Sequence, residues 1–153
     1  MSANNRILWV VASRSSFQVD LDWNLYFAPR SRPSEEHLYI GIYYAGSVRA
    51  IGEEVTAVDV EVDTKRPIYV SGQEPGEDAV RRIEGAVEDA WERFGWDIGR
   101  GYRFFLVDRF YETNFTPVRE IDGPRYVDLE EWVPKMPRTT ERLALELTGR
   151  RWS

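Results

Sequence analysis

The segment 101–115 constrains the fold of this chain more than any other stretch. It alternates large apolar and aromatic side chains with arginine, aspartate and threonine. A strand of this kind buries one face and holds polar or aromatic groups on the other. Residues 38–44 carry a similar pattern, Leu-Tyr-Ile-Gly-Ile-Tyr-Tyr. Aromatic strands with interleaved arginines can form a platform for flat ligands, and they also occur in ordinary small β-barrels.

The length and composition predict one globular domain spanning residues 1–153. A chain of 153 residues can bury a real core but is short for two domains. It has no cysteine, which excludes disulfides and thiolate metal sites. No apolar run approaches the roughly 20 residues that span a bilayer, and the N-terminus lacks a signal-peptide cleavage pattern. We therefore expect a cytoplasmic protein without a membrane partner.

The net charge of −6 opposes strong nonspecific binding to a phosphate backbone. The acidic residues gather in residues 51–100, which hold 13 acidic and six basic groups. The flanking segments are close to neutral and can still form a locally positive surface. Eighteen of the 20 basic residues are arginine, a side chain suited to bidentate and stacking contacts. Genomic base composition produces the same bias.

The first third of the chain predicts two strands separated by a long loop. Residues 7–12 form a continuous apolar run, which is typical of a central strand buried on both faces. Residues 17–33 end in two prolines four positions apart and predict an irregular functional loop. Residues 38–44 then predict a second strand, with a short hairpin partner at 47–51.

The remaining two thirds alternate strands with helices. Residues 54–63 place valines at alternate positions, which predicts an antiparallel strand. Apolar residues recur at helical spacing over 77–94, and Gly95 supplies a left-handed stop. One long strand over 101–115, with a bulge near Asp108 and Arg109, a strand over 125–129 and a helix over 140–148 complete the chain. This order predicts an α+β fold, with a mixed, strongly curved sheet or small β-barrel and flanking helices.

Aromatic, hydroxyl and arginine side chains are the candidate ligand-binding groups. Four aromatic residues are candidates for stacking on a flat ligand, and each is also a candidate for ordinary core packing. The turn after the first strand offers a hydroxyl and a guanidinium for a phosphate or a base edge, or forms a capped turn. The full predicted set is Ser13, Arg14, Trp23, Arg30, Tyr43, Tyr44, Arg109 and Tyr111.

A short acidic and basic pattern raises an enzymatic alternative. Asp63 and Lys65, with an acid upstream such as Glu53 or Glu54, match the skeleton of a magnesium-dependent nuclease site. A solvated strand end produces the same pattern. His37 is the only histidine, so a histidine-based metal cluster is excluded. We assign no catalytic residue, metal site or cofactor, and the sequence leaves open whether the chain is an enzyme.

The order of elements resembles the PUA-like superfamily, which includes the EVE, ASCH and YTH domains. Residues 7–13, 38–48 and 102–129 carry the likeness, which is one of architecture, without a residue-by-residue signature. Several members of that superfamily hold a modified or flipped base in an aromatic pocket. The resemblance therefore implies a non-catalytic module that binds a nucleobase-containing ligand, including a modified base in DNA or RNA. The alternatives are the nuclease and an acidic module that binds a protein partner through helix 77–94.

Overall fold

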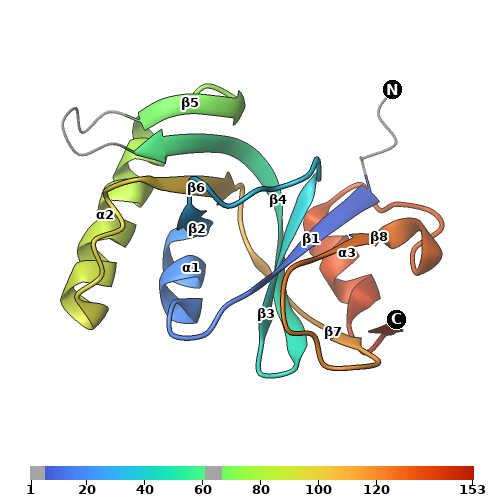
Figure 1. The fold of residues 1–153 in the computed structure, drawn as a ribbon. Helices are drawn as coiled ribbons and strands as arrows, with labels where there is room; N and C mark the ends of the chain where they lie inside the picture. Colours follow the sequence, from blue (N-terminus) through green and yellow to red (C-terminus); the bar gives the residue numbers. More distant parts are fainter. Residues whose placement is uncertain (1–5, 61–66) are drawn as a thin grey trace. The chain divides into compact units, whose positions relative to one another are not determined.

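The computed structural model describes residues 6–60 and 67–153. Their contacts divide the chain into two compact units, which we describe one at a time. Unit 1 contains residues 6–17, Glu35–Glu53 and Arg109–Ser153, and unit 2 contains Gln18–Ser34 and Glu54–Asp108. The 14-residue strand β4, Ser47–Val60, contributes its first half to unit 1 and its second half to unit 2 (Figure 1). The single domain expected from the length stays a prediction.

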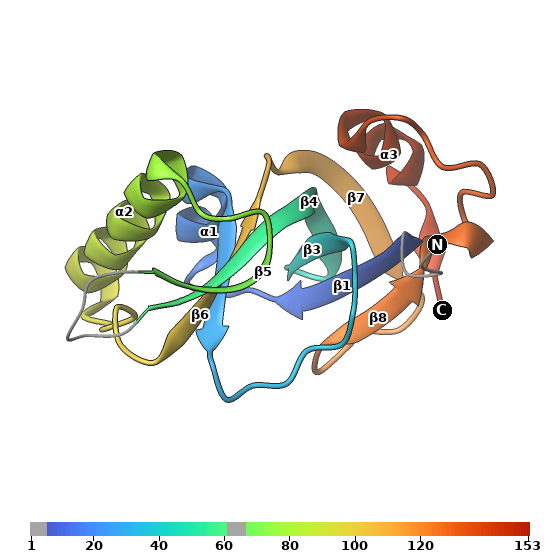
Figure 2. The ribbon, with the colours of Figure 1, turned by 90° about the horizontal axis from the view of Figure 1, so that it is seen from above.

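The sheet of unit 1 is built around β1, Ile7–Ala12. β1 pairs in parallel with β3, Tyr39–Tyr44, and antiparallel with β8, Arg125–Asp128. Figure 2 shows β1 between these two neighbours. Leu8 to Val11 are fully or almost fully buried, because β1 is a central strand with both faces covered. The predicted buried central strand is confirmed.

On the other side of β3, the strand pairs of unit 1 are antiparallel except for the last one. β4 pairs with β3 and with β7, Tyr111–Pro117, and β7 pairs in parallel with the short β9, Arg151–Trp152. Helix α3, Thr140–Leu147, begins at Thr139, whose hydroxyl accepts a hydrogen bond from the Arg142 backbone N–H. The strands and helices bury one apolar core. Its largest members include Leu8, Ile51, Phe115, Leu129, Leu143 and Trp152.

Unit 2 is a four-stranded antiparallel sheet with two helices. The strand order is β2, Leu25–Pro29, then β6, Tyr102–Val107, then β4 and β5, Pro67–Gly72. Helix α2, Glu77–Phe94, begins and ends where the apolar periodicity predicts. Gly95 ends it in the left-handed region with a φ of 71°, which favours glycine.

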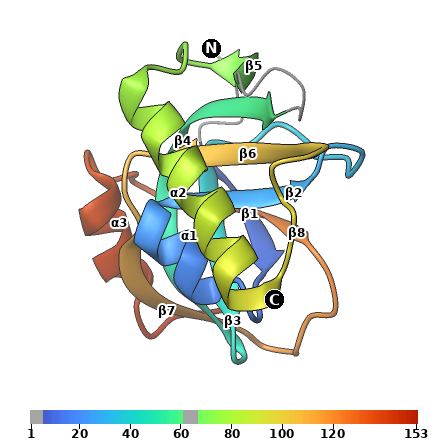
Figure 3. The same ribbon diagram turned by 90° about the vertical axis from the view of Figure 1, so that its left-hand side faces the viewer.

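Helix α2 covers the sheet of unit 2 together with the short helix α1, Phe17–Trp23. Ala79, Ile83, Ala86 and Ala90 form its buried stripe. They pack in one core with residues of α1, β2, β4 and β6. Figure 3 shows α2 in front of β6 and beside α1. The small alanines let the helix approach closely, so the second core is compact.

Three predicted elements are corrected by the structure. The loop expected over residues 17–33 is wrong in its first part, which folds into α1 and β2. The single strand expected over 101–115 is two strands, β6 and β7, separated at Asp108 to Phe110. The separate strands at 47–51 and 54–63 join as β4 over the described residues.

The structure confirms the α+β class. The described residues contain three α-helices and a nine-stranded mixed sheet, with β4 as the strand common to both units. The chain of strand pairings in this part of the molecule does not close, so the barrel alternative is not found. The strong curvature stays a prediction. None of the described helices combines the length and apolar character needed to cross a bilayer.

Candidate functional site

A cleft of about 530 Å³ in unit 1 gathers four of the predicted ligand-binding residues. Ser13 and Arg14 follow β1, and Tyr43 and Tyr44 end β3. Because β1 and β3 are parallel, their carboxyl ends meet at one edge of the sheet, where polar residues can face a ligand. The Ser13 backbone N–H donates to the Tyr43 carbonyl oxygen at 2.8 Å and fixes the two strand ends together. The volume lies in the range of small-molecule sites.

The opposite wall of the cleft comes from the loop between β7 and β8. Glu120, Ile121 and Asp122 line it. None of these three residues belongs to the predicted ligand-binding set. The loop carries no pattern beyond exposed charge, and only the tertiary fold brings it to the strand ends. The cleft thus has aromatic and hydroxyl groups on one wall and two carboxylates on the other.

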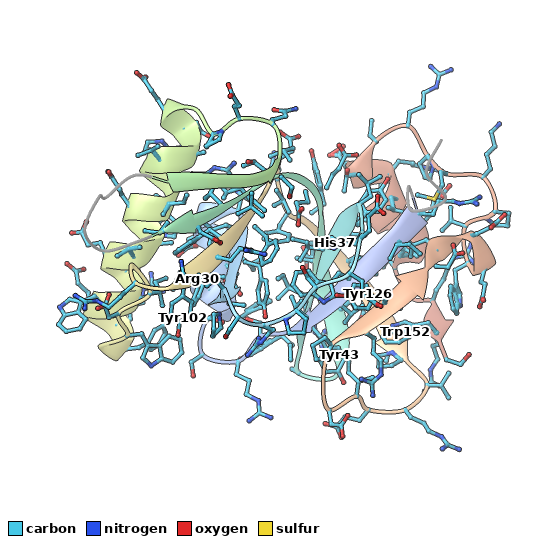
Figure 4. The ribbon with its side chains drawn as sticks, turned by 45° about the horizontal axis from the view of Figure 1, so that its top comes forward. Arg30, His37, Tyr43, Tyr102, Tyr126 and Trp152 are labelled. Atoms are coloured by element: carbon cyan, nitrogen blue, oxygen red, sulfur yellow. The ribbon has the colours of Figure 1, made fainter. Side chains whose placement is uncertain are left out.

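Tyr43 lines the cleft, is only 7% exposed and belongs to the buried core of unit 1. Its hydroxyl has no hydrogen-bond partner among the described residues. A buried polar group left in this state costs about 1–3 kcal/mol. A ligand atom that reached this hydroxyl would relieve the cost. Figure 4 labels Tyr43 among the side chains of unit 1.

Tyr44 stands at the open side of the cleft and is 40% exposed. Its ring stacks on Phe17, with centroids 4.3 Å apart and planes inclined by 8°. The exposed surface of this pair is available for a further flat ring. Stacking on an aromatic side chain contributes about 1–3 kcal/mol per base.

The turn after Tyr44 is held by Arg49. Its Nε donates to the Tyr44 carbonyl at 2.9 Å, and its Nη2 donates to the Ala45 carbonyl at 2.7 Å. Ala45 and Gly46 both have positive φ, 50° and 87°, as a tight hairpin between β3 and β4 requires. For alanine this conformation costs about 1–2 kcal/mol. Arg49 therefore keeps Tyr44 in place at the mouth of the cleft.

The charges around the cleft favour a ligand with hydrogen-bond donors. Arg14 is exposed and supplies one positive charge, whereas Glu120 and Asp122 supply two negative charges. Asp122 already contacts Arg125, with its Oδ1 3.3 Å from Nη2. The buried Ser13 Oγ lies 3.2 Å from the Ser16 Oγ. This arrangement suits the amino and carbonyl edges of a heterocycle better than a bare phosphate group.

Arg109 and Tyr111 belong to unit 1 but are not among the cleft-lining residues. The Arg109 guanidinium carbon lies 5.4 Å from the centroid of the Tyr111 ring, which is a cation–π contact. Each side chain therefore has a structural partner. Their part in ligand binding stays a prediction.

Trp23 and Arg30 belong to unit 2. The Trp23 Nε1 donates to the Asp89 Oδ2 at 2.8 Å, and its ring packs against Gly85 of α2. Asp89, which the helical pattern places on the outward face, is thus a partner of α1. The Arg30 backbone N–H donates to the Gly101 carbonyl at 3.0 Å, and its side chain is exposed (Figure 4). The ligand-binding roles of Trp23 and Arg30 stay predictions.

The lone histidine packs in an aromatic cluster of unit 1 (Figure 4). The His37 ring lies 4.9 Å from the ring of Trp9, and Trp9 stacks with Tyr126 at 6.1 Å. The Tyr126 hydroxyl accepts a hydrogen bond from the Glu35 backbone N–H at 2.7 Å. Burial raises the pKa of Tyr126. These contacts give His37 and Tyr126 a structural role in anchoring the segment before β3.

The nuclease alternative falls mostly outside the described residues. Glu53 and Glu54 lie in β4, but Asp63 and Lys65 belong to the segment that the structure does not describe. Within residues 6–60 and 67–153, no group of three or more His, Asp or Glu side chains could hold a metal ion. The nuclease therefore stays a prediction that magnesium-dependent cleavage, abolished by Lys65→Ala, would test.

Comparisons with protein-family models, curated proteins and solved structures gave no match to this chain.

Proposed function

We propose that unit 1 is a non-catalytic recognition module that binds a nucleobase-containing ligand in the cleft between Tyr44 and Glu120. The observation that carries the proposal is the exposed Tyr44 ring, already stacked on Phe17, at the mouth of the cleft. A base that stacks on this pair would place its polar edge near the cleft wall. The buried Tyr43 hydroxyl and the two carboxylates supply partners for ring nitrogens and amino groups.

The charges of the cleft favour contacts with the base of a nucleic acid over contacts with its phosphate backbone. Among the residues that line the cleft, Arg14 is the one cation, and two acidic residues line the same cleft. A phosphate held there would meet net negative charge, so the base must provide most of the affinity. The resemblance to the PUA-like superfamily points in the same direction, because several of its members hold a base in an aromatic pocket. A modified base in DNA or RNA is the corresponding ligand.

Titration with the four common ribonucleosides, and with short single-stranded DNA and RNA containing methylated bases, tests the proposal. We expect Tyr44→Ala to weaken binding about 10- to 100-fold, as loss of one stacking platform predicts. Trp96→Ala is the matched control, since this tryptophan is also 40% exposed and packs on a phenylalanine, Phe94, but belongs to unit 2 and does not line the cleft. No binding by any probe, or equal losses in the two variants with the fold intact, would contradict the proposal.

A second candidate function rests on the exposed face of α2. Glu77, Glu84, Glu88 and Glu92 lie within one face at helical spacing, and none pairs with a cation in the described part of the chain. Trp91 stands on the same face and is 61% exposed. Unpaired carboxylates around an exposed indole suit a lysine- or arginine-rich protein partner, through ion pairs and cation–π contacts.

Charge reversal separates this candidate from nonspecific attraction. We expect the double variant Glu84→Lys and Glu88→Lys to weaken binding of a lysine-rich peptide at least tenfold. The variant Glu112→Lys and Glu141→Lys changes the net charge equally at exposed positions of unit 1 and serves as the control. Equal losses of peptide affinity in both double variants would show that only net charge matters, and would contradict α2 as the docking face.

A further inference from the structure

A second cleft of about 520 Å³ lies in unit 1, beside the first. Glu120 and Ile121 line both clefts, so the loop between β7 and β8 is the wall that they share. The rest of the second cleft is formed largely by aromatic and apolar groups from β8, β9 and the segment after η2, Leu129–Glu131. None of its residues belongs to the predicted ligand-binding set. It is a separate candidate site.

Two tryptophans in this cleft differ in their hydrogen bonding. The Trp132 Nε1 donates to the Arg151 carbonyl oxygen at 2.9 Å, so this indole is engaged by the protein itself. Trp152 is only 5% exposed, and its Nε1 has no acceptor among the described residues. An indole N–H can only donate, so it remains unsatisfied until an acceptor arrives.

The fold holds Trp152 firmly in this position. Its ring packs 5.9 Å from the ring of Phe115, which also contacts Trp132 edge-on at 5.8 Å. The Val118 backbone N–H donates to the Trp152 carbonyl oxygen at 2.7 Å, and β9 pairs with β7. The side chain therefore cannot turn its nitrogen toward water without breaking packed contacts. The nitrogen has almost no accessible surface, so an acceptor reaches it only when the groups that cover it move locally.

The charges of the cleft limit the ligand to a single negative charge. The Arg119 guanidinium makes no ion pair within the described residues, whereas Arg125 is engaged by Asp122 and by two carbonyl oxygens of its own loop. Three carboxylates also line the cleft, from Glu120, Asp128 and Glu131. Because they outnumber the two arginines of the lining, they disfavour a polyanion such as a phosphate chain more strongly than a single carboxylate placed beside Arg119. The Arg119 guanidinium and the Trp152 Nε1–H are therefore the groups left to bind an anionic acceptor.

We propose that this second cleft binds a small apolar molecule with a single carboxylate. One carboxylate oxygen accepts the hydrogen bond from the Trp152 Nε1, and the negative charge pairs with Arg119. The flat, apolar remainder of the molecule packs against the Trp132 ring, which is half-buried. Aryl monocarboxylates combine these features. The inference is independent of the proposed nucleobase site, because the two clefts offer different polar groups.

The indole N–H resonances of the ¹⁵N-labelled chain test this directly. Six are expected from the six tryptophans, and Trp152→Phe identifies its own by removing it. The probes are 2-naphthoate, its neutral carboxamide and the cationic 2-naphthylmethylamine. We expect 2-naphthoate to move the Trp152 resonance downfield and saturably, because a new hydrogen bond deshields the proton. The carboxamide should bind about five- to tenfold more weakly, and the amine should not bind.

Two variants complete the test. Trp152→Phe keeps an aromatic ring but removes the donor, so 2-naphthoate should bind at least tenfold more weakly while the remaining indole resonances keep their positions. Arg119→Gln should lower affinity for 2-naphthoate five- to tenfold and leave that for the carboxamide unchanged. An unmoved Trp152 resonance, or equal binding by Trp152→Phe, would overturn the proposal. Equal affinity for all three probes would do so as well.

Discussion

The two units of the chain differ in the hydrogen bonding of the polar side chains described above. In unit 2 the named polar groups serve the fold: Trp23 donates to Asp89, and Arg103 forms a two-point ion pair with Asp59 at 2.7 and 3.2 Å. In unit 1 the hydroxyl of Tyr43 and the indole nitrogen of Trp152 are buried without hydrogen-bond partners in the described chain, and each residue lines a cleft. Unsatisfied buried donors are costly and are typical of functional positions. Both of these residues line the candidate clefts of unit 1, which is the part of the chain to which the proposed ligand sites belong.

Replacing Arg82 should give the largest loss of stability among these predictions, because its side chain bonds to groups within unit 2. Its Nη1 donates to the carbonyl oxygens of Asn24 and Val107, both at 2.8 Å, and its Nε lies 3.1 Å from an Asp78 carboxylate oxygen. Burial lowers the pKa of Arg82. We expect Arg82→Met to lower the free energy of unfolding by about 3 kcal/mol, because two carbonyls lose a charged donor. Urea denaturation measures the loss.

Arg81→Met is the matched control for Arg82. The neighbouring arginine pairs with the same Asp78 but has 64% of its side chain exposed, so its removal should change stability by less than about 0.5 kcal/mol. If both substitutions had the same small effect, Arg82 would not join α1 to β6 as the geometry indicates.

Gly85 tests how tightly Trp23 is seated on α2. Alanine in place of a mid-helix glycine normally stabilises a helix by about 1 kcal/mol. At Gly85, however, an added methyl group would collide with the Trp23 ring, which its bond to Asp89 keeps in place. We therefore expect Gly85→Ala to lower the free energy of unfolding by about 1–2 kcal/mol. Gly76→Ala, which meets no atom within 4 Å but stands at the N-cap of α2, should cost only about 0.5 kcal/mol. A stabilised Gly85→Ala variant would contradict this packing.

A pair of tyrosine substitutions compares the units directly. The Tyr26 hydroxyl of unit 2 accepts a hydrogen bond from the Arg32 Nη1 at 3.0 Å, whereas the Tyr43 hydroxyl of unit 1 has no partner in the described chain. Tyr26→Phe should lower the free energy of unfolding by about 1 kcal/mol. Tyr43→Phe should leave it unchanged or raise it by up to about 1 kcal/mol, while weakening nucleobase binding. Equal destabilisation by the two substitutions would contradict the difference in hydrogen bonding between the two tyrosines.

The smallest expected effect is a pH dependence at Tyr39 of unit 1. Burial, followed by the nearby Glu53 charge, raises the pKa of Tyr39 above its ordinary value. The unfolded chain therefore loses the phenol proton first as the pH rises. Stability from Tyr39 should be complete below about pH 10 and fall as the pH approaches the higher folded value.

Thermal unfolding between pH 9 and 11 measures this dependence. Tyr39→Phe should reduce the alkaline loss by up to about 1 kcal/mol, since one proton contributes at most about 1.4 kcal/mol per pH unit. Tyr44→Phe, at an exposed position of the same strand, is the control. Identical curves for both variants would show that Tyr39 ionises equally in the folded and unfolded chains.

Strong local patterns account for the parts of the fold that the sequence predicts. The apolar run of β1 and the helical spacing of α2 each determine an element by themselves, and Gly95 marks the helix end. Helix α1 escapes prediction because it has only seven residues, too few to show a period. The sequence pattern does not reveal the end of β6, because aromatic residues continue on both sides of Asp108.

Local sequence patterns also account for the part of the candidate site that could be predicted. Ser13, Arg14, Tyr43 and Tyr44 stand at the ends of apolar strands, where a polar or aromatic residue is locally unusual. Their meeting in one cleft depends on the parallel pairing of β1 with β3, which no local pattern encodes. The Glu120 wall and the unsatisfied Trp152 nitrogen depend on contacts between distant segments. Such contacts are a property of the tertiary structure alone.

The interrupted path of the chain through unit 1 has a consequence for biosynthesis. Its central strand β1 emerges first from the ribosome, whereas Trp152, which completes β9, emerges some 140 residues later. Unit 2 has all its segments once Asp108 is made. We therefore expect unit 2 to fold first during translation. Unit 1 is then completed last, after a period in which its apolar first strand needs protection from aggregation.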